Sequence, residues 1–141
     1  MLTTLITNIK DALEDVAGLD GKVYPYPVSK PAGYPFAVFF PIAFNNRFLS
    51  SAENMIGERF RIFLVYETQQ AGLENVWKTF LPNLVDAVRN ELAETWNQGT
   101  IGGSGRVWWS LETGEWTQEI TQQGGTVTAS LDLIVNYSTD I

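Results

Sequence analysis

The sequence lacks both cysteine and histidine over its 141 residues. Without cysteine no disulfide framework can form, and without either residue the usual ligand sets for zinc and iron–sulfur clusters are missing. Without histidine there is no Ser-His-Asp triad and no imidazole to transfer protons near neutral pH. The chemistry that remains is that of carboxylate, lysine, serine and tyrosine. We therefore expect a protein that is not an enzyme and that uses no cofactor and no metal.

Positive charge and long apolar runs are scarce as well. Nine Lys and Arg oppose 16 Asp and Glu, which gives a formal net charge of −7 and argues against binding to the phosphate backbone of nucleic acids. No apolar run approaches the roughly 20 residues that span a bilayer, and the N-terminal segment lacks the basic start of a secretory signal. We expect no membrane partner, no specific nucleic acid binding and one globular domain over residues 1–141.

Two segments show the apolar spacing of an amphipathic helix. The first covers residues 2–16 and is followed by Gly18, in the position of a helix-ending glycine. The second covers residues 72–96, and its apolar stripe consists of Trp77, Leu81, Leu84, Val88, Leu92 and Trp96. Pro82 lies inside this second segment and predicts a kink or a break, because proline removes one backbone hydrogen bond.

Four prolines, at positions 25, 27, 31 and 35, exclude a helix and predict a stiff extended arm. The arm leads into a strand over residues 36–42, and Pro41 predicts that this strand ends or reaches a sheet edge there. Residues 45–57 are polar and show no apolar period, so we expect a long loop.

Residues 58–67, ERFRIFLVYE, alternate strictly and predict a strand. Its core face carries Phe60, Ile62, Leu64 and Tyr66. Its second face mixes charged and apolar residues, namely Arg59, Arg61, Phe63, Val65 and Glu67. Arginine on such a face can pair with a carboxylate of a neighbouring subunit.

The last third of the sequence indicates β structure only. A turn at Thr113-Gly114 is expected after RVWWSLE, and the polar TQQGGT leads into a long half-buried strand over residues 126–137. The order of helices and strands predicts an α+β fold, with a mixed, mainly antiparallel sheet of four to five strands and two helices packed on one face.

Trp108 and Trp109 are neighbours in the sequence, so on a strand they point to opposite faces. One of them serves the core. The other is covered by the helices or the arm, or it belongs to a partner surface, where tryptophan is enriched. A platform for sugar stacking around Trp108 and Trp116 is a further possibility, and it defines the more distant alternative of a small carbohydrate- or ligand-binding module.

The order of segments resembles that of the tail terminator proteins of long-tailed bacteriophages, in particular the lambda-type members. The similarity begins with Tyr34-Pro35 opening the apolar strand PFAVFF, and it continues through the polar segment 45–57 and the alternating ERFRIFLVYE. ENVWKTFLPNLVDAV is similar to the family's helix with an internal aromatic residue followed by proline. The polar hairpin into TVTASLDLIVNYS completes the resemblance.

This resemblance implies a structural protein without catalysis or cofactor. Its copies would form a homohexameric ring that caps the tail tube, ends tube polymerisation and provides the head-joining surface. The implied partners are other copies of the chain, the tail tube protein and a head-side connector or neck protein. The implied location is the head-proximal end of the tail in the virion, after assembly in the host cytoplasm. Head–tail neck and tail-completion proteins share much of this layout and are the alternative.

A ring subunit must offer contact surfaces to its neighbours, and faces that mix charge with apolar groups suit specific contacts between soluble subunits. On this basis we predict a subunit or partner interface formed by Arg47, Phe48, Met55, Arg59, Arg61, Phe63 and Trp108.

Overall fold

A twisted five-stranded sheet with the order β1-β2-β3-β5-β4 forms the body of the computed structural model. The structure describes residues 2–29, 31–48, 53–68, 72–96, 107–121 and 124–140. In chain order the elements are α1 (Leu2–Glu14), β1 (Val23–Tyr24), β2 (Phe36–Phe48), β3 (Glu53–Glu67), α2 (Leu73–Asn75), the π-helical turn η1 (Val76–Phe80), α3 (Leu81–Trp96), β4 (Val107–Thr121) and β5 (Gly124–Asp140). β1 pairs in parallel with β2, and the other pairs are antiparallel.

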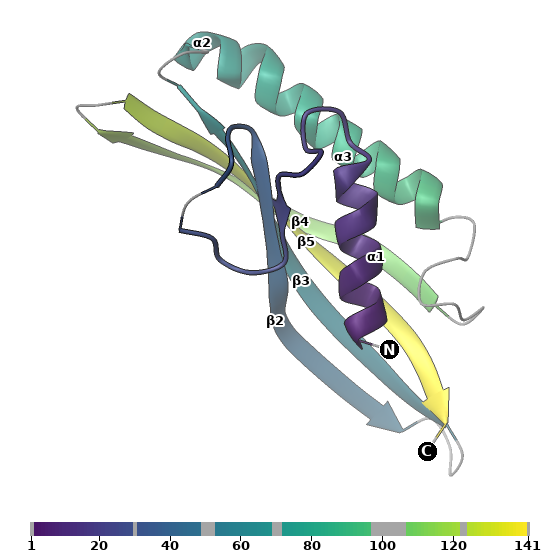
Figure 1. The fold of residues 1–141 in the computed structure, drawn as a ribbon. Helices are drawn as coiled ribbons and strands as arrows, with labels where there is room; N and C mark the ends of the chain where they lie inside the picture. The colour runs from purple at the N-terminus through teal and green to yellow at the C-terminus, as the bar shows by residue number, and fades with distance from the viewer. Residues whose placement is uncertain are drawn as a thin grey trace.

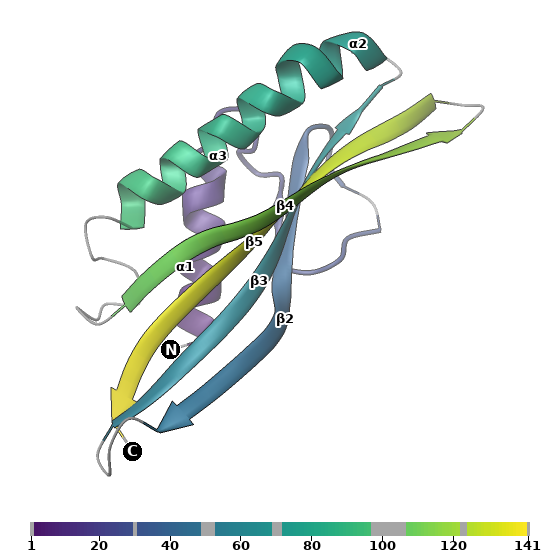
Figure 2. The same ribbon diagram turned by 180° about the vertical axis from the view of Figure 1, so that it is seen from behind.

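The helices cover one face of this sheet and leave the other uncovered (Figures 1 and 2). The apolar stripe of α1 buries Leu5, Ile9 and Leu13 completely, and α3 buries Val88 and Leu92 in the same core. The sheet contributes the core face of β3 and its partners, which are Phe39, Phe60, Ile62, Leu64, Val127, Leu131, Leu133 and Val135. The predicted α+β fold, with a mainly antiparallel sheet and two helical segments on one face, is confirmed.

The predicted loop over residues 45–57 is wrong, because most of it belongs to two long strands. β2 continues to Phe48 and β3 begins at Glu53, with Asn45 opposite Gly57 in the antiparallel ladder. β3 also pairs with β5 along this stretch. This part of the sheet extends beyond the helices (Figure 1), so neither face needs an apolar residue at every second position. The strands therefore lack the alternation that would have revealed them.

Pro41 lies inside β2 at an edge of the sheet, one of its two predicted positions. β1 pairs only with Ala37 and Val38, so the β2 backbone around Pro41 has β3 on one side alone. Proline has no backbone N–H group to donate to a neighbouring strand, and a position at the edge of a sheet tolerates this missing hydrogen bond. The register shifts between Pro41 and Ala43, as in a β-bulge.

The predicted turn at Thr113-Gly114 is wrong as well. β4 is one strand, and its register against β5 shifts between Leu111, opposite Leu133, and Gly114, opposite Leu131. A Cβ atom on Gly114 would lie 2.9 Å from the Ser130 carbonyl oxygen, so the close backbone approach at this bulge requires glycine. The chain reverses later, where Thr121 pairs with Gly124, as the polar hairpin predicts.

Pro82 changes the helical geometry without breaking the helix. The turn η1 precedes it directly, and the Leu81 amide donates to the Val76 carbonyl five residues back. A π-helical turn at this point accommodates a residue that has no amide hydrogen.

The proline-rich segment loops back on its own chain and is not an extended arm. The Ala32 amide donates a hydrogen bond of 2.8 Å to the Tyr24 hydroxyl. The Tyr24 and Tyr34 rings both contact Phe36, with ring centroids 6.3 Å and 5.3 Å away, and the Tyr34-Pro35 peptide bond is cis. The prolines thus route the chain around the start of β2.

Candidate functional site: the uncovered face of the sheet

The uncovered face is built from the alternate residues of three neighbouring strands. On β3 these are Arg59, Arg61, Phe63 and Val65, as the alternation predicts. Their partners across the ladder are Phe36, Val38, Phe40 and Ala43 on β2, and Thr128, Ser130, Asp132 and Ile134 on β5. The face therefore has an apolar side along β2 and a polar side along β5, with β3 between them.

An aromatic pair marks the apolar side. The Phe40 and Phe63 ring centroids are 5.8 Å apart with an interplanar angle of 32°, and both residues remain partly exposed. Phe36 and Val38, nearer to the proline-rich segment, are each only 8% exposed. The apolar surface open to a partner is thus centred on Phe40, Phe63 and Val65.

A buried carboxylate joins the two predicted arginines. Arg61 donates from Nε to Asp132 Oδ1 at 2.9 Å and from Nη2 to Oδ2 at 3.3 Å, and Arg59 donates from Nη1 to Oδ2 at 3.3 Å. The Asp132 side chain is 6% exposed, against 37% for Arg59 and 42% for Arg61. The hydrogen bond and the charge of Asp132 raise the pKa of Arg61 above its ordinary value. Asp132 of the same chain is thus a carboxylate partner of both arginines, and their pairing with a neighbouring subunit stays a prediction.

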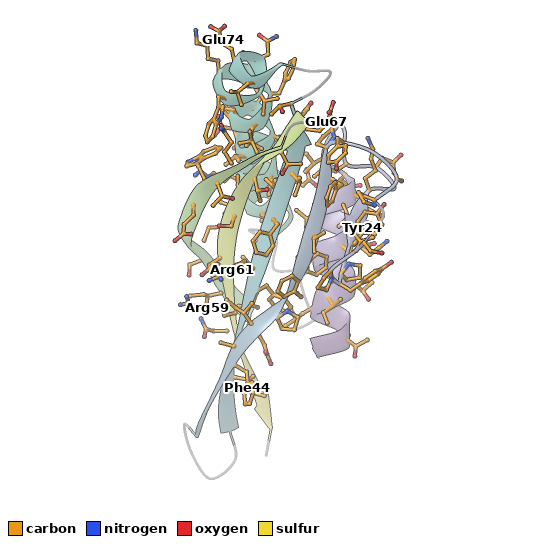
Figure 3. The ribbon with its side chains drawn as sticks, turned by 90° about the vertical axis from the view of Figure 1, so that its left-hand side faces the viewer. Tyr24, Phe44, Arg59, Arg61, Glu67 and Glu74 are labelled. Carbon is orange, nitrogen blue, oxygen red and sulfur yellow. The ribbon has the colours of Figure 1, made fainter. Side chains whose placement is uncertain are left out.

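A shallow polar hollow of about 140 Å³ adjoins this cluster, lined by Arg61, Phe63, Gly114, Glu115, Thr117, Ser130 and Asp132. Gly114, at the bulge in β4, is one of its lining residues. Glu115 is exposed at its rim, and its charge adds to the stabilisation of the Arg61 cation. Figure 3 shows Arg59 and Arg61 on the same side of the sheet.

The other predicted interface residues lie elsewhere in the sheet. Arg47 is opposite Met55, and Phe48 is opposite Asn54, at the far end of the β2–β3 pair. Trp108 lies in β4 opposite Asn136. The side chains of Arg47, Phe48, Met55 and Trp108 are outside the described part of the structure, so only their register positions are known.

Trp108 and Trp116 do not share a face of the sheet. Trp108 is opposite Asn136 and Trp116 is opposite Ala129, and these two β5 positions alternate between faces. Trp116 instead contacts Trp77 of η1, with ring centroids 5.9 Å apart, and the Trp77 Nε1 group donates to Gln118 Oε1 at 2.6 Å. The sugar platform proposed from Trp108 and Trp116 is therefore not formed by this register.

Sequence analysis did not identify two acidic residues of this region that are nearly buried, Asp132 and Glu58. The sequence does contain a signal for Asp132, because it is the only charged residue in the alternating segment 126–137 and lies between Leu131 and Leu133. Glu58 is 7% exposed although it begins the alternating strand, and burial raises its pKa above the ordinary value. Its cross-strand partners are Phe44 on β2 and Val135 on β5.

No metal-binding cluster and no membrane-spanning helix is found in the described ranges. Among these residues, no group of three or more acidic, His or Cys side chains could hold a metal ion. None of the helices described is both long and apolar enough to cross a membrane. No protein-family model matches the sequence, and no curated protein matches it.

Proposed function

We propose that the chain is a structural phage protein of the tail terminator type, whose copies form a ring on the end of the tail tube. The ring would stop tube polymerisation and present a surface to the head-side connector. The observation that carries the proposal is the uncovered sheet face, where the Phe40–Phe63 pair lies beside the Arg59–Asp132–Arg61 cluster.

This face has the composition of a protein–protein contact. Partly exposed aromatic and β-branched side chains lie together, and charged groups border them on one side, an arrangement that commonly marks an interaction surface. Arginine and aromatic residues are enriched in such interfaces. Because Asp132 holds both guanidinium groups in place, they lose little conformational freedom when a partner binds.

The element order also supports the proposal. An N-terminal helix, an apolar strand after Tyr34-Pro35, an alternating strand, a helix with an internal proline and a final hairpin follow one another in the order that the resemblance implies. The polar loop that the resemblance implies over residues 45–57 is the exception, because the ends of β2 and β3 occupy most of that segment. The elongated β2–β3 pair gives the subunit a sheet that extends past its helices (Figure 2). Such an extension can reach a neighbouring copy in a closed ring.

The test is to add the purified protein to growing tail tubes and to measure tube length by electron microscopy. We expect tubes that stop growing and carry a ring at one end. The variant Phe63→Glu should weaken ring formation, while Lys78→Glu, a charge reversal on exposed η1, should not. Rings that form but leave tube growth unchanged would reject the terminator function and favour a neck role. A wild type that never assembles, even with tubes present, would reject the ring itself.

A further inference from the structure

Glu58 is a nearly buried carboxylate on the helix side of β3. It is 7% exposed, and its cross-strand neighbours are Phe44 on β2 and Val135 on β5. Among the described residues no hydrogen bond or ion pair reaches this carboxylate, and burial alone raises its pKa. A buried charge without a partner destabilises the free subunit, so a cation bound at the same place would offset that effect.

A cavity of about 560 Å³ lies along the edge of β2 and has Glu58 in its lining. Its other lining residues are all apolar and all exposed, namely Pro41, Ile42, Ala43 and Phe44. β1 pairs with β2 only before this stretch, so none of the described strands covers the outer edge of β2 here. The site therefore combines an apolar wall with a single carboxylate at a place that another molecule can reach.

This combination fits a guanidinium group on an aliphatic stem. The carboxylate of Glu58 can pair with the cation, and the ring of Phe44, which is 81% exposed and directly opposite, offers a face for cation–π contact. The stem can pack on Pro41 and Ile42. Arginine fits better than lysine, because its planar cation is more weakly hydrated and stacks on aromatic rings.

The charges of the chain favour a different protein as the source of this arginine. The structure describes the side chains of three arginines, and each has a carboxylate of its own chain nearby. Arg59 and Arg61 are held by Asp132, and Arg89 lies 3.6 Å from Asp86. The whole chain carries a net charge of −7, so two copies repel each other at long range whereas a basic protein is attracted.

We infer that Glu58 and the exposed edge of β2 form a pocket for an arginine side chain of a different protein. The bound guanidinium pairs with Glu58 and lies against the ring of Phe44. The pocket is on the helix side of the sheet, whereas the proposed ring was argued from the uncovered face. The inference thus goes beyond the proposed function and can be tested whether or not rings form.

The test measures binding of N-acetylarginine amide to the full chain by saturation-transfer NMR, with N-acetylcitrulline amide as the neutral probe of the same shape. We expect a Kd on the order of 1 mM for the arginine probe and binding at least about tenfold weaker for citrulline. Glu58→Gln keeps the shape of the side chain and should weaken arginine binding by about tenfold or more. Phe44→Leu keeps an apolar group and should weaken it by roughly two- to fivefold. Glu74→Gln is the matched control, because Glu74 is an exposed carboxylate at the other end of the subunit (Figure 3), and it should bind like the wild type.

Several outcomes would overturn the inference. Equal binding of the arginine and citrulline probes, or unchanged arginine binding to Glu58→Gln, would show that the carboxylate does not bind a cation. N-acetyllysine amide bound as tightly as the arginine probe would overturn the assignment to arginine. Self-association of the wild type that Glu58→Gln abolishes would overturn the choice of a different protein in favour of a second copy. A protein that binds the arginine probe but forms no rings would reject the proposed function and support the pocket.

Discussion

At the scale of single residues, the Arg59–Asp132–Arg61 cluster is asymmetric. Asp132 is almost fully buried, whereas both arginine side chains keep more than a third of their surface in water. An arginine that loses its partner can be hydrated, but a buried carboxylate that loses two cations cannot. Leaving the aspartate without its partners therefore costs more stability than leaving either arginine without the aspartate.

We predict that Arg59→Gln with Arg61→Gln lowers the free energy of unfolding by about 2–3 kcal/mol, and that Asp132→Asn lowers it by only about 1 kcal/mol. Urea denaturation of both variants beside the wild type measures the difference. If Asp132→Asn proves the more damaging change, the asymmetry is refuted. Reversing both arginines to glutamate would surround Asp132 with like charge, so that variant reports on folding as well as on assembly.

Glu58 predicts a pH dependence of stability. Burial raises its pKa in the folded state above the unfolded value, so its unfavourable effect is absent below the unfolded pKa of about 4.3 and grows as the pH rises through the folded pKa. Glu58→Gln should therefore raise the free energy of unfolding at pH 7 to 8 by on the order of 1 kcal/mol. The gain should vanish near pH 4. Thermal melts at both pH values test this, and a gain of equal size at pH 4 would contradict it.

At the scale of elements, the sequence predicted those whose residues alternate or repeat against the core. The first helix, the strand around Phe60 and Ile62, and the strand over residues 126–137 all pack one apolar face against helices or sheet. Residues 45–57 and the bulge at Gly114 were mispredicted, because their geometry depends on partners distant in the chain. Polar strand ends are held by ladder hydrogen bonds to β3 and β5, which no local pattern reveals.

Gly114 supplies the element-scale prediction. Gly114→Ala should lower stability by about 1–3 kcal/mol, because its Cβ would press on the backbone oxygen of Ser130 at 2.9 Å and disturb the bulge. Gly33→Ala is the control, since its Cβ would meet only the Lys22 side chain at 3.9 Å, and it should be neutral or slightly stabilising. Equal effects of the two substitutions in thermal melts would show that the bulge is not under this constraint.

At the scale of the whole molecule, only half of the candidate site could be predicted. Alternation alone places Arg59, Arg61 and Phe63 together on a second face. Their partners Phe40 and Asp132 come from strands whose order β2-β3-β5 brings distant segments side by side. Likewise, the exposure of Phe44 follows from where the helices end, which depends on tertiary packing. Sequence periodicity reports the faces of an element but not what covers them.

Ring formation by the purified wild type is the central claim. Its most direct test is negative-stain electron microscopy of the isolated protein over a range of concentrations, with native mass spectrometry to count the subunits. The account predicts closed rings of uniform size, and the resemblance to tail terminators sets the expected number at six. A protein that remains monomeric at every concentration, with tail tubes as well as without them, would contradict it.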